Sequence, residues 1–108
     1  MVSVTLTREA RKRLSELPRL IAVRMEKLLV RLAQWPNVSG VKRLGGDLTG
    51  KCRLRTGDYR LQFHVQETRK AIKTKQMVKG KEVIVEQHIT DYAVVVEKIG
   101  HRDGFYEE

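Results

Sequence analysis

Two short runs of alternating side chains, joined by a tight turn, constrain the fold of this chain more than any other feature. The stretch KCRLRTGDYRLQFHVQ covers residues 51–66, and a Thr-Gly-Asp turn at 56–58 separates its two runs. Side chains two apart in a strand share a face, so Cys52 and Leu54 point to the same side. A short turn that contains glycine, between two alternating runs, predicts a β-hairpin.

The two sides of this hairpin differ in polarity. One side carries the apolar members of the alternation: Cys52, Leu54, Tyr59, Leu61, Phe63 and Val65. The other side carries four cations and no carboxylate, next to polar side chains: Lys51, Arg53, Arg55, Arg60, Gln62, His64 and Gln66. Such a face suits an anion, and the alternative is an ordinary solvated sheet face. The stretch leaves both interpretations open.

Length, cysteine content and charge narrow the class of protein. The 108 residues are enough for one domain, residues 1–108, with a single core. One cysteine excludes an internal disulfide, and we find no membrane-spanning run and no signal peptide, so we expect a cytoplasmic protein. The formal net charge of +9 predicts a polyanionic partner, which is nucleic acid, an acidic protein or a charged membrane surface.

The first third of the chain predicts a strand and two helices. Residues 2–6 alternate apolar and polar side chains, as a short strand does. Thr7 suits the N-cap of a first helix, whose apolar face is Ala10, Leu14 and Leu17. Pro18 suits the first position of a second helix that continues to Trp35. The apolar residues of this second helix have helical spacing: Ile21, Met25, Leu28, Leu32 and Trp35.

The rest of the chain predicts more strands. Residues 37–50 contain four glycines and are expected to be irregular. Residues 82–88 and 92–99 have the composition of two strands that Asp91 separates, and the second is apolar enough to be central in a sheet. The expected class is α+β, with a short N-terminal strand and two helices packed on one face of a mainly antiparallel sheet.

A basic segment lies between these strands. Residues 69–81 contain six cations and no acid. They form either a mobile basic loop or the tip of an extended hairpin that turns at Lys79-Gly80. We therefore expect residues 67–90 to be an extended hairpin or a basic loop insertion in the single domain.

Several kinds of chemistry find little support. Residues 45–52 approach the phosphate-loop pattern, but Cys52 stands where that pattern needs Ser or Thr and a strand follows instead of a helix. Three scattered histidines and one cysteine offer no metal-ligand spacing, and no Gly-x-Ser-x-Gly motif occurs. We expect no metal and no cofactor.

Cations can nevertheless support cleavage of RNA. The 2′-hydroxyl must lose a proton, the charge of the pentavalent phosphate must be stabilised, and the 5′-oxygen must leave with a proton. The hairpin supplies a cluster for the phosphate: Lys51, Arg53, Arg55 and Arg60. Tyr59 alternates toward the core and Tyr92 opens a buried strand, which leaves Tyr106 as the tyrosine available for proton transfer.

The arrangement of these motifs resembles the RelE/ParE superfamily of bacterial toxins over nearly the whole chain. The resemblance rests on Lys42-Arg43-Leu44, Arg53-Leu54-Arg55, the turn Gly57-Asp58-Tyr59-Arg60-Leu61, and the ending Ile99-Gly100-His101-Arg102 with Tyr106. The segment 67–90 departs from the family by its length. RelE-like members cleave messenger RNA on the ribosome, whereas ParE-like members inhibit DNA gyrase.

The RelE-like branch matches better, and it implies a catalytic set of Lys51, Arg53, Arg60, Arg102 and Tyr106. The resemblance implies that Tyr106 or Lys51 assists deprotonation and that Arg53 and Arg60 stabilise the transition state. It also implies that Arg102 protonates or steadies the leaving group. Arg53 stands where the family often has lysine, and arginine stays charged, so it is suited to hold phosphate rather than to transfer a proton.

The remaining assignments concern binding. Further side chains are expected to contact RNA: Lys42, Arg43, Arg55, His64, His101, Arg69, Lys70, Lys73 and Lys75. The resemblance implies a cognate antitoxin as partner, together with the ribosome and mRNA. A gyrase inhibitor and a non-catalytic module that binds nucleic acid or an acidic partner stay open as alternatives.

Overall fold

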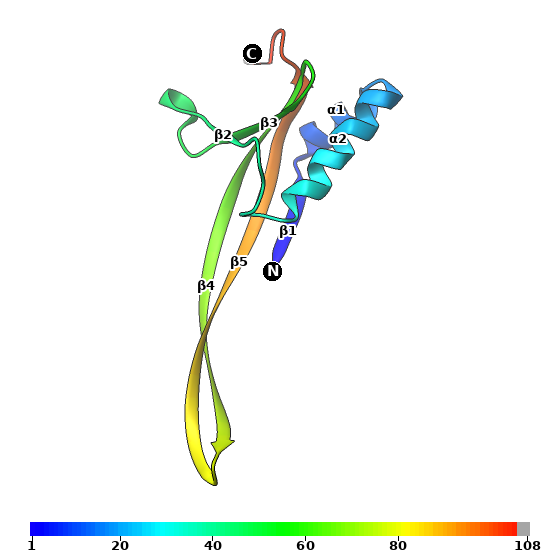
Figure 1. Ribbon diagram of the computed structural model, residues 1–108. Helices are drawn as coiled ribbons and strands as arrows, with labels where there is room; N and C mark the ends of the chain where they lie inside the picture. Colours follow the sequence, from blue (N-terminus) through cyan, green and yellow to red (C-terminus); the bar gives the residue numbers. More distant parts are fainter. Residues whose placement is uncertain (106–108) are drawn as a thin grey trace.

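A computed structural model describes residues 1–105 of the chain (Figure 1). The elements in order are β1 (Val2–Leu6), α1 (Arg8–Glu16), α2 (Arg19–Leu32), β2 (Lys42–Arg43), a short 3-10 helix (Gly46–Leu48), β3 (Cys52–Thr56), β4 (Tyr59–Val78) and β5 (Lys81–His101). The five strands form one sheet in the order β1-β5-β4-β3-β2. β1 runs parallel to β5, and the other neighbours are antiparallel. Two helices and a five-stranded mixed sheet confirm the α+β class.

The starts of the two helices differ in their capping. The Thr7 hydroxyl accepts a hydrogen bond of 3.1 Å from the Ala10 backbone N–H, as expected for an N-cap. Pro18 caps α2 from the position before the first helical residue, one place earlier than predicted. α2 ends at Leu32, so Trp35 lies beyond the helix and packs edge-on against Phe63 with ring centroids 5.6 Å apart.

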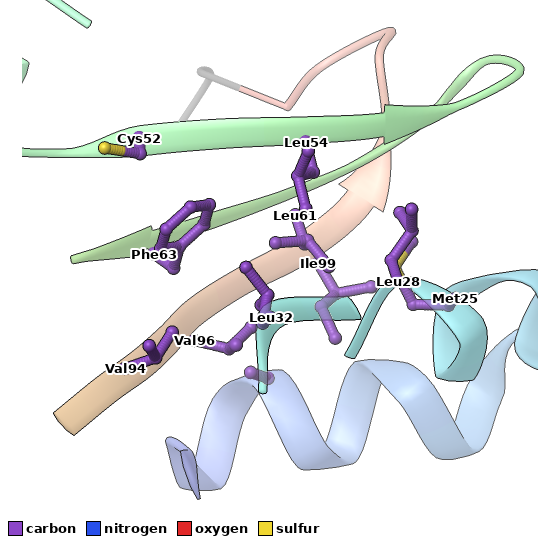
Figure 2. Close-up of a cluster of buried hydrophobic side chains, with 11 residues drawn as sticks. Met25, Leu28, Leu32, Cys52, Leu54, Leu61, Phe63, Val94, Val96 and Ile99 are labelled. Carbon is purple, nitrogen blue, oxygen red and sulfur yellow. The ribbon is translucent and has the colours of Figure 1, made fainter. Parts of the chain in front are cut away.

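One buried cluster forms the core, and both helices and three strands contribute to it (Figure 2). Its members are Ala10, Met25, Leu28, Leu32, Cys52, Leu54, Leu61, Phe63, Val94, Val96 and Ile99. Figure 2 shows Met25, Leu28 and Leu32 between the helices and the strands. Burial of each large apolar side chain contributes roughly 1.5–3 kcal/mol, so this cluster holds the helices against the sheet.

The predicted hairpin is confirmed with its apolar side toward the core, although Thr56 belongs to β3 and not to the turn. Cys52 pairs with Phe63 and Leu54 with Leu61, which brings the four apolar side chains to the core. The connection is the two residues between Thr56 and Tyr59. Gly57 lies in the left-handed region with φ of 61°, where a side chain would be strained.

β4 and β5 pair far beyond the body of the domain and form an arm, residues 66–92. Their pairing continues from Tyr59↔His101 to Val78↔Lys81, with a turn at residues 79–80. Residues 69–81 are therefore the distal part of an antiparallel ribbon and not a loop. Figure 1 shows the arm projecting past the rest of the molecule. The whole molecule, including the arm, is 65 Å along its longest axis.

Two expectations about the strands are wrong. Asp91 does not separate two strands, because it pairs with Thr68 and the ladder of β5 continues through it. Residues 37–50 are not wholly irregular, because β2 pairs with β3 through Lys42↔Arg53 and Arg43↔Cys52. None of the helices within residues 1–105 is long and apolar enough to span a membrane.

Candidate functional site

Strand register gathers the expected cations on one side of the sheet. Arg55 lies directly opposite Arg60, and Lys42 lies directly opposite Arg53. Directly opposed residues share a face, and opposed like charges destabilise a sheet. We call the set formed by Lys42, Lys51, Arg53, Arg55 and Arg60 the cationic face. An anion bound there would relieve the repulsion within both pairs.

Arg60 has the least satisfied side chain of this face. Its Nε atom is buried and has no hydrogen-bond partner within residues 1–105. Leaving a buried donor unpaired costs on the order of 1–3 kcal/mol, and more for a charged group. The guanidinium is thus positioned to donate to a ligand that carries acceptor oxygens.

Phe105, the last described residue, lies against Gly100 in the strand next to Arg60. Gly100 of β5 is the register partner of Arg60. A Cβ atom added to Gly100 would lie 3.5 Å from the ring of Phe105, so this ring covers the backbone there. Phe105 is buried, with 3% of its surface exposed. Tyr106 comes next in the sequence but lies outside the described residues, so its assignment stays a prediction.

A β-bulge brings a carboxylate to this side of the sheet. Gln62 pairs with Lys98 and Phe63 with Val96, which leaves Glu97 as an extra residue in β5. The Thr7 hydroxyl donates to the Glu97 carbonyl at 3.0 Å, which holds the bulge at the start of α1. Bulges often re-aim a side chain beside a functional site.

Glu97 joins two residues of the predicted site. Its Oε2 accepts from Lys51 Nζ at 2.5 Å, and its Oε1 lies 3.0 Å from His64 Nδ1. Burial alone would raise the pKa of Glu97, but the hydrogen bonds and charges of Lys51 and His64 outweigh it, so the pKa is lowered. We call these three residues the Lys51–Glu97–His64 triad. All three side chains are partly buried, with 23–31% exposed.

Sequence reasoning missed Glu97. The hairpin carries no carboxylate on its polar side, as expected, but the adjacent strand β5 supplies one. Alternation does place Glu97 on the side opposite Val94 and Val96, and this was the available signal. The apolar residues of the run 92–99 dominate its pattern and indicate a central strand, so the single carboxylate does not stand out.

Arg102 lies at the end of the β3–β4 hairpin. Its backbone N–H donates to the Asp58 carbonyl at 2.7 Å, which ties the end of β5 to the turn. Its Nε atom is 3.8 Å from carboxylate oxygens of both Asp58 and Asp103, and the side chain is 58% exposed. The two carboxylates compete with any anion for this guanidinium.

Two of the expected RNA contacts are turned away from the cationic face. His101 pairs with Tyr59, which packs against the core, and their rings meet edge to face at 5.1 Å. Arg43 lies opposite the buried Cys52. Arg43 follows Lys42 of the cationic face by one residue, and His101 follows Gly100, the register partner of Arg60, by one residue. A step of one residue along a strand moves the side chain to the other side of the sheet.

Three of the four arm cations that are expected to contact RNA lie beside carboxylates. Arg69 forms an ion pair with Glu67 at 3.1 Å, and Lys75 forms one with Glu82 at 3.4 Å. Lys73 lies opposite Glu86 in the register, and Lys70 lies opposite Ile89. Residues 66–92 carry six Lys and Arg against four Asp and Glu, so the arm contributes little of the net charge of +9.

Other chemistries gain no support from the geometry. Within residues 1–105, no group of three or more His, Cys, Asp or Glu side chains is placed to hold a metal ion. Burial raises the pKa of the Cys52 thiol, although Arg43 partly opposes this, so the thiol stays protonated near neutral pH.

The same fold occurs in one chain of the crystal structure of the toxin–antitoxin complex RelBE2 from Mycobacterium tuberculosis. The TM-score is 0.60 at 23% sequence identity, and the match covers 93% of this chain and 96% of that one. No protein-family model and no curated protein match this chain. The expected RelE/ParE resemblance is therefore confirmed at the level of fold, and the domain has a RelE-like fold.

Proposed function

We propose that this protein is the toxin of a type II toxin–antitoxin system and acts as a metal-independent endoribonuclease. It cleaves mRNA on the ribosome by attack of a 2′-hydroxyl on the neighbouring phosphate. The RelE-like fold supports the toxin class, and the cationic face supports a phosphate as the reacting group.

Arg60 is the observation that carries this proposal. A buried Nε that has no partner among residues 1–105, on a side chain opposite a second arginine, is suited to the paired acceptor oxygens of a phosphate. Arg60 and Arg53 stabilise the charge that develops on the pentavalent phosphate. Both are permanently charged, so they act by electrostatics and not by proton transfer.

The other members of the catalytic set act around this phosphate. Lys51 lies on the same face as Arg53, two residues away in the chain, and adds positive charge. Arg102 steadies the leaving 5′-oxygen, and it must first exchange its carboxylate neighbours for the substrate. Tyr106, four residues after Arg102, contributes a hydroxyl for proton transfer.

The proposed partners are a cognate antitoxin and the ribosome with its mRNA. The RelBE2 structure is a complex of a toxin with its antitoxin, and the proposal extends that kind of partner to this chain. An acidic segment of an antitoxin would neutralise the cationic face and thereby inhibit cleavage.

The direct test is mRNA cleavage on programmed ribosomes by wild-type protein and by Arg60→Ala. We expect Arg60→Ala to lower the single-turnover rate by on the order of 10²-fold or more, because it removes a charge that the transition state needs. Arg11→Ala is the matched control, since it removes an exposed arginine from α1.

Unchanged cleavage by Arg60→Ala would contradict the residue assignment. Accumulated gyrase cleavage complexes with intact mRNA would instead support the ParE-like alternative. Binding to nucleic acid that depends steeply on salt, without any cleavage, would support a non-catalytic module.

A further inference from the structure

The triad contains a histidine that the proposed mechanism leaves without a chemical role. His64 of β4 lies on the same side of the sheet as the cationic face, and its side chain is 28% exposed. Nδ1 faces the carboxylate of Glu97 at 3.0 Å. Nε2 has no hydrogen-bond partner within residues 1–105, so this nitrogen is available to a ligand.

Glu97 determines which ring nitrogen carries the proton. Its lowered pKa keeps the carboxyl ionised near neutral pH, so both oxygens can only accept hydrogen bonds. Lys51 donates to one oxygen, and the other must receive a hydrogen from His64 Nδ1. The neutral ring then has a bare Nε2, which is the form that accepts a proton.

The same contacts make Lys51 unsuitable as a base. Its Nζ donates to a Glu97 carboxylate oxygen at 2.5 Å, and a lysine ammonium group is a donor with no lone pair to accept a proton. Arg53 and Arg60 also remain charged. Both oxygens of the Glu97 carboxylate are already engaged by Lys51 and His64, so among the described residues of this side we assign proton acceptance to the imidazole of His64.

We propose that His64 is the general base of the cleavage reaction and that Glu97 is its positioning residue. This inference rests on the proposed function. Glu97 of β5 contacts the imidazole, Lys51 shares the Glu97 carboxylate with it, and Arg53 of β3 lies on the same side of the sheet. Arg53 and His64 are diagonal neighbours across the β3–β4 pair, a separation of about 7–8 Å that long side chains and a phosphate can bridge.

Each proton that moves in this step has a donor and an acceptor. His64 Nε2 takes the proton of the 2′-hydroxyl while the 2′-oxygen forms its bond to phosphorus. The bond between phosphorus and the 5′-oxygen breaks, and the 5′-oxygen takes a proton from water. The hydroxide that remains removes the proton from the imidazolium. The products are a 2′,3′-cyclic phosphate and a 5′-hydroxyl, and no proton is consumed overall.

Glu97→Gln gives a sharp test because of Lys51. Lys51 can only donate, so the single amide oxygen at position 97 must accept from it. The amide NH₂ then faces His64 Nδ1 and forces the proton onto Nε2, which blocks base catalysis. A carboxylate-to-amide change that flips a catalytic histidine in this way is known to be severe in serine proteases.

The experiment measures single-turnover cleavage on programmed ribosomes from about pH 5 to pH 8, the range in which histidine ordinarily titrates. We expect His64→Gln and Glu97→Gln each to lower the rate by on the order of 10²-fold. Both variants should also lose the rise of the rate with pH. The controls are His88→Gln and Glu86→Gln, two exposed positions on the arm.

Ring ¹⁵N chemical shifts of His64 provide a readout that needs no activity. The wild type should show the proton on Nδ1, and Glu97→Gln should move it to Nε2. Wild-type cleavage with His64→Gln within twofold of it would overturn the inference. If the wild type does not cleave, the proposed function fails, and the tautomer then decides the inference: a proton on Nε2 in the wild type overturns it.

Discussion

Glu97 links the register of β4 and β5 to the charges of the candidate site and to the stability of the fold. The bulge in β5 directs it toward Lys51 and His64, and no periodicity in the sequence specifies that bulge. Alternation could indicate the side on which Glu97 lies, but not that its carboxylate reaches both partners. Contacts of this kind depend on a shift of one residue between two strands, which becomes visible only when the strands are paired.

The lowered pKa of Glu97 predicts a pH dependence of stability. A carboxyl whose pKa is lower in the folded than in the unfolded state stabilises the fold above its unfolded pKa, about 4.3. That contribution is lost as the pH falls through the folded value. We therefore expect the wild type to lose stability more steeply than Glu97→Gln below about pH 4.3.

Urea midpoints of the two proteins between about pH 3 and pH 7 measure this effect. The difference between them should be largest near neutral pH and shrink in acid. Glu86→Gln on the arm serves as a control for the loss of an exposed carboxyl. A difference that stays constant over the whole pH range would show that the triad does not stabilise the fold through the charge of Glu97.

At the scale of elements, periodic patterns were the reliable predictors. Alternation predicted the β3–β4 hairpin and the side on which its residues lie, and the helical spacing of Met25, Leu28 and Leu32 predicted the buried face of α2. Local composition failed at Asp91, because its partly exposed carboxylate pairs with the N-terminal ammonium group of Met1 at 3.2 Å while its backbone stays in the ladder opposite Thr68. Pairing with β4, and not the local sequence preference, determines that β5 continues through Asp91.

Substitutions in the arm test whether its cations contribute to RNA binding. Changing Arg69, Lys70, Lys73 and Lys75 together to Gln should weaken ribosome association and leave the cleavage rate of bound protein unchanged. The expected loss is modest, because Glu67, Glu82 and Glu86 already neutralise part of this charge. The measurement is affinity for programmed ribosomes at about 0.15 M salt, where the screening length is about 8 Å.

A matched variant separates position from charge. Changing Arg8, Arg11, Lys12 and Arg13 of α1 to Gln removes the same number of cations from a different element. Equal loss of affinity in both variants would mean that only net charge matters. Unchanged affinity in the arm variant would remove Arg69, Lys70, Lys73 and Lys75 from the binding surface.

At the scale of the whole molecule, the body and the arm divide the structure. The body holds the core, the cationic face and the triad, whereas the arm is exposed along nearly all of its length. A net charge of +9 indicated the sign of a partner but not which surface meets it. Pairing of the strands concentrates cations of the body at the candidate site, and the likeness to a chain of the RelBE2 complex lies in the fold.

We propose that the protein cleaves mRNA only as it is translated. The most direct measurement is primer extension on a reporter message after brief induction of the protein. One reporter carries its start codon, and an otherwise identical reporter lacks it. We expect new 5′ ends within the translated message and none in the untranslated one. Growth arrest with both messages intact would contradict it.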